Sequence, residues 1–245
     1  MSTQKSRIAF ITGGNRGIGL QTARELGQLG IEVILGVRDP ENTSALRTLR
    51  AEGIAAEAIH YDTAKPETDQ TAFAYLERRF GKLDILVNNA GALQEPLMGN
   101  DAVTLPEATL RDTFEINFFA LVRLTQTLVP LVRKSDAGRI VNLSSVLGSL
   151  TLHAAPDSPI AATKAFAYNA SKTALNAFTI HLADALRDTP IKVNSAHPGW
   201  VKTPLGGPAA PMEIADSAKT SVRLATLGVD GPSGGFFHTG DSLPW

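Results

Sequence analysis

The sequence predicts a doubly wound parallel α/β sheet, arranged in three α/β/α layers within a single domain that spans residues 1–245. Short apolar runs alternate with longer amphipathic segments along the whole chain. This alternation is typical of parallel strands that helices cover on both faces. A hydrophobic fraction of 43% provides a large core, and no repeat or low-complexity tract divides the chain.

The individual elements follow from the spacing of apolar residues. The apolar runs expected to form strands are 8–12, 32–36, 55–61, 84–87, 139–143, 191–196 and a short last run at 235–238. The segments with helical spacing are 17–29, 41–52, 67–80, 106–132, 164–187 and 212–227. Two stretches rich in Pro, Ala and Gly, 149–163 and 203–211, follow strands, so we expect them to overhang a ligand crevice at the carboxyl ends of the strands.

Composition excludes several classes of function. The net charge of −1, from 23 basic and 24 acidic residues, argues against nucleic-acid binding. The absence of cysteine removes disulfides and thiol nucleophiles, and the five histidines lack metal-ligand spacing, so no metal site is expected. The chain shows no signal-peptide pattern and no uninterrupted apolar stretch of ~18 residues. We therefore expect a soluble cytoplasmic protein without a membrane partner.

A glycine-rich turn, Thr12-Gly-Gly-Asn-Arg-Gly-Ile-Gly19, joins the first expected strand to the first expected helix. Glycines allow a tight turn and a close approach of the backbone to phosphate, and the helix N-terminus offers unpaired N–H groups to a pyrophosphate. The turn predicts a Rossmann-type, NAD(P)-binding domain, with an ordinary loop turn as the alternative. The expected cofactor contacts are Gly13, Asn15, Arg16, Gly17, Ile18 and Gly19.

Tyr168 and Lys172 are four residues apart on an expected helix, so they share one face. A free phenol has a pKa near ~10 and is a poor acid–base group at neutral pH. An adjacent ammonium stabilises the phenolate and is expected to move that pKa toward neutrality. The pair indicates proton transfer; a half-buried tyrosine beside a lysine that reaches solvent is the structural alternative.

Two serines, Ser144 and Ser145, end the fifth expected strand. A hydroxyl at the carboxyl end of a parallel strand points into the ligand crevice, where it can donate to a substrate oxygen. Because neighbours along a strand face opposite sides, one serine is expected in the crevice, and the other is expected to bind backbone.

Together with Asn88-Asn-Ala-Gly91 and Asn117, these motifs stand in the order and setting of the short-chain dehydrogenase/reductase family, which the chain resembles from Ile8 to about Val201. The resemblance implies the same fold and hydride transfer between a nicotinamide cofactor and a carbonyl or alcohol. The family motif places its catalytic serine second in the pair. The catalytic residues so implied are Asn117, Ser145, Tyr168 and Lys172.

The resemblance also implies how the cofactor is bound. Lys172 would hydrogen-bond the nicotinamide ribose, Asn117 would hold a water that links the lysine to solvent, and Asp62 would accept from the adenine amine. Backbone after the fourth and sixth strands, together with Tyr168, would lie against the cofactor. Those further contacts are Asn89, Ala90, Gly91, Pro198, Gly199, Val201 and Thr203, whereas no catalytic role is assigned to His197.

The end of the second expected strand indicates which cofactor is preferred. Family members that prefer NAD carry an acidic residue there, which accepts from the ribose 2′-hydroxyl and would repel a 2′-phosphate. Here Val37 occupies that position, and Arg38 follows it, with Arg16 in the glycine-rich turn. Two guanidiniums make charge-assisted contacts to a phosphate, so we expect NADPH to be preferred over NADH. Two solvated surface arginines are the alternative, and Asp39 is expected to cap the next helix.

Three loops, 93–105, 146–164 and 203–211, are expected to form the substrate site. Their apolar side chains favour a small lipophilic carbonyl substrate over an anionic one. Trp200 either lines the pocket or packs under its loop. The candidate pocket walls are Leu93, Val146, Leu147, Trp200, Leu205 and Trp245.

The glycine-rich turn and the C-terminal segment resemble the carbonyl-reductase-like branch of the family. Ser145 and Tyr168 are 23 positions apart, more than is typical of the family, but the insert is smaller than in that branch, whose members are monomers. The choice between a monomer and a homo-oligomer therefore stays open. The sequence predicts an NADPH-dependent carbonyl reductase. The alternatives are an NADP-linked alcohol dehydrogenase that acts oxidatively and a non-catalytic NADPH-binding sensor.

Overall fold

The structure, a computed structural model, describes residues 6–97 and 102–245. In this part of the chain one sheet has the strand order β3-β2-β1-β4-β5-β6-β7-β8, and all neighbours are parallel except β7 and β8. The strands are β1 (Ile8–Thr12), β2 (Glu32–Val37), β3 (Ala56–His60), β4 (Ile85–Asn88), β5 (Arg139–Leu143), β6 (Lys192–Ala196), β7 (Phe236–His238) and β8 (Asp241–Ser242). The order runs outward from β1 in both directions, which confirms the doubly wound topology.

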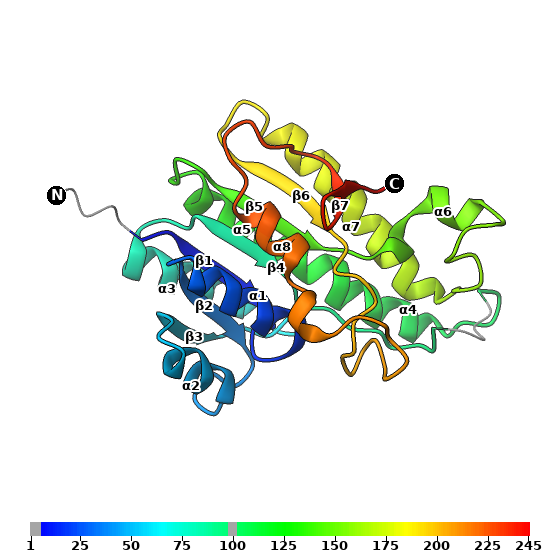
Figure 1. The fold of residues 1–245 in the computed structure, drawn as a ribbon, viewed down its shortest axis with the longest axis horizontal. Helices are drawn as coiled ribbons and strands as arrows, with labels where there is room; N and C mark the ends of the chain where they lie inside the picture. Colours follow the sequence, from blue (N-terminus) through cyan, green and yellow to red (C-terminus); the bar gives the residue numbers. More distant parts are fainter. Residues whose placement is uncertain (1–5, 98–101) are drawn as a thin grey trace.

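Helices cover both faces of this sheet (Figure 1). One face packs against α1, α2 and α8 through a core that includes Ala9 and Leu35. The other packs against α3, α5 and α7 through a core that includes Phe10 and Ile34. The helices are α1 (Gly17–Gln28), α2 (Ser44–Ala51), α3 (Glu67–Phe80), α4 (Glu107–Phe114), α5 (Ala120–Val132), α6 (Leu150–Ala154), α7 (Phe166–Ala185) and α8 (Lys219–Ala225). The predicted three layers are confirmed.

The predicted bounds of two helices are wrong. The helix expected over 41–52 begins only at Ser44, because the Asp39 carboxylate accepts from the backbone and side chain of Asn42 and so forms a turn before it. The helix expected over 212–227 is reduced to a 3-10 turn, Ile214–Asp216, and α8.

Two further elements were not predicted. The stretch 149–163, expected as a loop, contains α6, whose first turn is capped by the Ser149 hydroxyl accepting from the Leu152 N–H at 3.2 Å. Strand β8 returns antiparallel to β7 after a turn in which Thr239 has a φ of 53°. Both elements are too short for apolar periodicity to reveal them.

One described stretch, Glu107–Val132, is long and apolar enough by length and composition to cross a membrane, with a mean hydropathy of 1.2. In the structure it is a continuous helix formed by α4, a π-helical turn η1 (Glu115–Phe119) and α5. It packs against α3, α7 and β4. A helix in the core of a protein passes the same test, so the stretch is weak evidence for a membrane span.

Arg139, at the start of β5, is a buried cation that the sequence did not single out. Its guanidinium donates five hydrogen bonds of 2.7 to 3.1 Å to the carbonyls of Gly138, Pro190, Leu227 and Gly228. All five donors of the side chain are therefore used. This interaction attaches the segment after α8 to the amino end of the sheet.

We expect Arg139→Met to lower the free energy of unfolding by about 3 kcal/mol, because the carbonyls of Pro190 and Leu227 lose their buried partner. Chemical denaturation measures the change. Arg187→Met is the matched control, since Arg187 pairs with Asp184 on the surface and its loss should cost about 0.5 kcal/mol or less. Equal stabilities of the two variants would contradict the assigned role.

Candidate active site

A cavity of about 880 Å³ runs along the carboxyl ends of the parallel strands. Residues that follow six successive strands line it, among them Gly13, Arg38, Asp62, Asn89 and Ser145. Every residue that the sequence predicted to contact a cofactor lies on its wall. Contact with a cofactor stays a prediction for each of them.

The junction between β1 and β4 forms the floor of one end of the cavity. Thr12 Oγ1 accepts hydrogen bonds from the backbone N–H groups of Asn89 and Ala90, at 3.0 and 2.9 Å, and the Asn89 side chain donates to the Thr12 carbonyl at 2.7 Å. Gly19 packs against this junction so closely that a Cβ atom would lie 2.5 Å from both Asn89 Nδ2 and the Gly13 carbonyl. Only glycine therefore fits at position 19.

The glycine-rich turn fits a pyrophosphate. Gly17 has a φ of 54° and begins α1, while the preceding Arg16 makes no side-chain cap. In the described residues the N–H groups of this first turn are thus left to face the cavity, where a helix N-terminus favours an anion. The turn can hold the phosphates of a dinucleotide.

The serine, tyrosine and lysine of the predicted catalytic set meet at the centre of the cavity wall. Tyr168 and Lys172 lie on α7, and Ser145 follows β5. The Ser145 hydroxyl lies close enough to the Tyr168 phenol to lower its pKa. Lys172 Nζ lies 5.7 Å from the centre of the Tyr168 ring and donates to the Leu143 carbonyl at 2.7 Å.

Burial controls the protonation of this set. It raises the pKa of Tyr168 to about 12, and the hydrogen bond from Ser145 lowers that pKa only in part. Burial also lowers the pKa of Lys172 to about 8. The expectation that the tyrosine pKa moves toward neutrality is therefore wrong in this structure, because burial is the largest influence on the phenol and acts in the opposite direction. At neutral pH the phenol holds its proton and can donate it.

The two serines after β5 have different roles. Ser144 donates to the side chain of Asn176 at 2.7 Å, so the expectation that it binds backbone is wrong, although it too lies on the cavity wall. Ser145 accepts from the Leu147 N–H at 3.2 Å and lies close enough to Tyr168 to lower the pKa of the phenol. The choice of Ser145 over Ser144 for the crevice agrees with this geometry.

Asn117 lies within the π-helical turn η1 and is fully buried. The side-chain amide of Asn117 hydrogen-bonds both backbone groups of Ala92. It accepts from the Ala92 N–H at 2.8 Å and donates to the Ala92 carbonyl at 2.9 Å. Nδ2 also donates to Ser171 Oγ at 3.1 Å. Asn117 thus joins the segment after β4 to α7, and its role in a proton relay stays a prediction.

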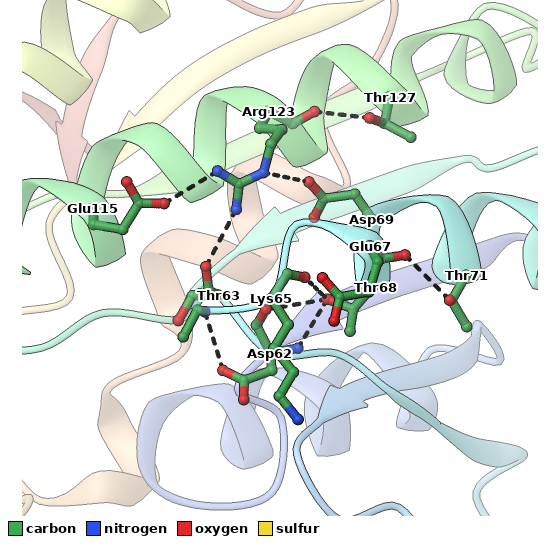
Figure 2. A network of polar contacts seen from close by, with 11 residues as sticks. Asp62, Thr63, Lys65, Glu67, Thr68, Asp69, Thr71, Glu115, Arg123 and Thr127 are labelled. Carbon is green, nitrogen blue, oxygen red and sulfur yellow. Dashed lines mark hydrogen bonds and ion pairs between the residues drawn. The ribbon is translucent and has the colours of Figure 1, made fainter.

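Asp62 is held in place by a compact turn after β3 (Figure 2). Its carboxylate accepts from the Ala64 N–H at 3.1 Å, and its own N–H donates to Thr68 Oγ1 at 3.2 Å. The Thr68 hydroxyl also lies 2.7 Å from the Lys65 carbonyl. The turn presents Asp62 to the cavity.

Arg123 on α5 braces this turn from the other side (Figure 2). Its guanidinium donates to Asp69 at 2.7 Å, to Glu115 at 3.1 Å and to the Thr63 carbonyl at 3.2 Å. Burial raises the pKa of Asp69, and Arg123 opposes that shift by favouring the charged carboxylate. The network joins the predicted adenine-binding loop to α5.

Four of the six predicted substrate-site residues, Val146, Leu147, Trp200 and Leu205, line the cavity. Trp200 is half exposed, and its indole N–H donates to the Gly206 carbonyl at 2.7 Å. Leu93 and Trp245 are not among the described residues on the wall. Trp245 instead stacks on Phe236, with ring centres 5.6 Å apart.

Other wall residues were not predicted individually, because apolar periodicity does not show which side chains of a loop or of a buried helical turn face a cavity. Leu97, four residues after Leu93, lines the cavity. The remaining apolar and polar wall residues that were missed include Ile116, Pro159, Ile160 and Thr163.

His197 also lines the cavity. Its Nδ1 accepts from the Val146 N–H at 3.3 Å, so Nε2 carries the ring proton. Burial, and then the ring of His238 with its centre 4.8 Å away, lowers the pKa of His197 to about 3. His197 is therefore a neutral hydrogen-bonding group at physiological pH.

A dinucleotide cradle beside a serine, a tyrosine and a lysine defines the class of protein, a nicotinamide-dependent oxidoreductase. The profile of the short chain dehydrogenase family matches residues 7–213, and the chain belongs to this family. The chain is 30% identical to short-chain dehydrogenase/reductase 1 of Saponaria officinalis, over 98% of this chain and 97% of that protein. It is 31% identical to salutaridine reductase of Papaver bracteatum, over 95% and 94% of the two chains.

Solved structures show the same likeness. The NADPH-bound carbonyl reductase from chicken fatty liver superposes with a TM-score of 0.84, at 26% identity, over 98% of this chain and 99% of that one. The carbonyl reductase Sniffer of D. melanogaster superposes with a TM-score of 0.83, at 27% identity, over 98% and 99% of the two chains. The family-level assignment to carbonyl or ketone reductases follows from these relatives.

We expect Thr68→Val to weaken binding of the nicotinamide cofactor about 3- to 10-fold, because the loss of one hydroxyl removes about 0.5–1.5 kcal/mol of support for the Asp62 turn. Fluorescence titration measures the dissociation constant. Thr71→Val is the matched control, since the Thr71 hydroxyl bonds only the Glu67 carbonyl on the exposed side of α3. Equal dissociation constants for both variants would show that the turn does not support the cofactor.

Proposed function

We propose that this protein is an NADPH-dependent carbonyl reductase that converts a lipophilic ketone or aldehyde to an alcohol. The observation that carries the proposal is the meeting of Ser145, Tyr168 and Lys172 on the cavity wall, beside the glycine-rich turn that fits a dinucleotide. In this position the Tyr168 hydroxyl can give its proton to the oxygen of a carbonyl group, which carbonyl reduction requires. The likeness to salutaridine reductase and to a carbonyl reductase bound to NADPH supports this direction.

The chain's own residues perform three tasks in this reaction. Ser145 and Tyr168 hold the carbonyl oxygen by hydrogen bonds, so that charge developing on it is stabilised. Tyr168 then delivers its proton to that oxygen. Lys172, mostly protonated at neutral pH with a pKa of about 8, lies close enough to stabilise the phenolate that remains. NADPH, when bound, supplies the hydride that the carbonyl carbon receives.

Selection of NADPH rests on the groups around the end of β2. Arg38 and Arg16 are exposed on the cavity wall, and among the described residues neither forms an ion pair. Val37 stands where a carboxylate would repel a 2′-phosphate. The N-terminus of α2, at Ser44, also lines this end of the cavity and favours an anion. Together these groups favour a 2′-phosphate over a ribose hydroxyl, and the Asp39 carboxylate on the same wall is engaged by the backbone and side chain of Asn42.

The substrate end of the cavity supports a lipophilic carbonyl compound. Apolar side chains from three loops face it, including Leu97, Leu147 and Leu205. A neutral His197 adds a hydrogen-bonding group without a charge. Such a wall accepts an apolar ketone or aldehyde more readily than an anion. A cytoplasmic location, where NADPH is available, is part of the same proposal.

We expect Tyr168→Phe to lower kcat by about 1,000-fold or more, because the proton donor is removed while the ring remains. Consumption of NADPH with a panel of ketones, aldehydes and quinones measures the rate. The dissociation constant for NADPH should change little, which separates loss of chemistry from loss of binding. Substantial turnover by Tyr168→Phe would refute the assigned proton donor, and a wild-type protein that binds NADPH but reduces no carbonyl would favour a sensor.

We expect Arg38→Leu to raise the KM for NADPH about 10- to 100-fold, since a charge-assisted contact to phosphate is worth about 1.5–3 kcal/mol. The KM for NADH should stay nearly constant because NADH carries no 2′-phosphate. Steady-state kinetics with both cofactors measure this change. Equal losses with the two cofactors would mean that Arg38 does not contact the 2′-phosphate.

A further inference from the structure

The carboxylate of Glu95 caps the helix that carries the catalytic tyrosine. Helix α7 begins at Phe166, and its N-cap residue, Ala165, has no side-chain oxygen to accept a hydrogen bond. Glu95, 73 positions earlier in the sequence, accepts a hydrogen bond of 2.8 Å from the backbone N–H of Tyr168. Glu95 is only 7% exposed, so this bond is buried.

The position of this bond makes it important for the active site. The first N–H groups of a helix have no acceptor within the helix, and a negative charge there is stabilised by the helix dipole. Asn169, the next residue, already donates to the Ala165 carbonyl at 2.8 Å. Glu95 therefore binds the last N–H before the regular helical hydrogen bonds begin, and that N–H belongs to the catalytic tyrosine itself.

The segment that carries Glu95 is also held at its base. Ala92 lies three residues before Glu95 and is bound on both sides by the Asn117 amide. Leu97 lies two residues after Glu95 and lines the cavity. The Glu95 carboxylate thus connects the segment after β4, the substrate wall and α7.

We propose that Glu95 is a positioning residue that keeps the Tyr168 hydroxyl aligned with Ser145 and with the substrate oxygen. The inference rests on the proposed reductase function. Side chains of a helix lean toward its N-terminus, so the phenol lies over the turn that Glu95 holds. A displacement of about 1 Å in a reacting group can lower the rate on the order of 100-fold.

The test compares three substitutions in the full-length protein with NADPH and its best carbonyl substrate. We expect Glu95→Ala to lower kcat about 10- to 100-fold, with the dissociation constant for NADPH changed less than about 2-fold. Glu95→Gln keeps an oxygen that accepts from the Tyr168 N–H, so its kcat should stay within about 3-fold of wild type. Glu95→Asp, one methylene shorter, should fall between them and serves if Glu95→Ala does not fold.

Glu107→Ala provides the control. Like Glu95, Glu107 is a glutamate at the start of a helix, here α4, but it is exposed and pairs with Arg111 on the surface. The kcat of the Glu107→Ala variant should therefore equal that of wild type. Amide hydrogen exchange over residues 165–170 adds a readout that needs no turnover, because the Tyr168 N–H should exchange faster in Glu95→Ala and at the wild-type rate in Glu95→Gln.

The outcomes separate the two proposals. A wild-type protein that reduces no carbonyl overturns the reductase function and the catalytic consequence of Glu95, while the exchange data still report on the cap. In an active protein, an unchanged kcat in folded Glu95→Ala, or in folded Glu95→Asp where the alanine variant does not fold, overturns the positioning role. The positioning role is also overturned if the kcat of Glu95→Gln is as low as that of Glu95→Ala. It is overturned as well if Glu95→Ala loses kcat, NADPH binding and thermal stability in parallel.

Discussion

The close contact between β1 and the segment after β4 is the constraint on which the site depends. Thr12 and Asn89 exchange hydrogen bonds across the point where the strand order reverses, and Gly19 packs onto Asn89 with no room for a side chain. This contact sets where α1 begins and therefore where its free N–H groups point. It also fixes the start of the segment after β4, which is attached further along by the Asn117–Ala92 hydrogen bonds and by the bond from Tyr168 to Glu95. The phosphate cradle and the catalytic end of the cavity thus share one support.

Burial sets the chemistry of the catalytic set more than any single neighbour does. Tyr168 is buried in the cavity wall, and the loss of contact with water raises the pKa of its phenol. The same burial brings Lys172 within reach of neutral pH, although its ammonium still bonds the Leu143 carbonyl. The two shifts run in opposite directions because burial disfavours whichever form is charged.

Local patterns in the sequence were sufficient for the fold and for much of the site. Apolar runs located the seven parallel strands because strands covered on both faces are apolar throughout. The ends of those strands then indicated the cavity residues, from Gly13 to Thr203. Two kinds of feature remained hidden. The pKa of Tyr168 depends on how α7 packs, and the Glu95 contact joins residues 73 positions apart. No signal for this contact was visible in the sequence, because the expected helix began at 164 and Ala165 therefore lay inside it.

The π-helical turn η1 places one extra residue in the helix between α4 and α5. Asn117 within the turn faces Ala92, while Arg123 beyond it faces Asp69 and the Thr63 carbonyl. One residue corresponds to about 100° of rotation in an α-helix. Because the wider π turn takes up this rotation locally, deletion of its extra residue would leave Arg123 facing Asp69 but would close the turn that directs Asn117 toward Ala92. The helix could thus lose one residue without change at its two ends, but not without change to the site that it borders.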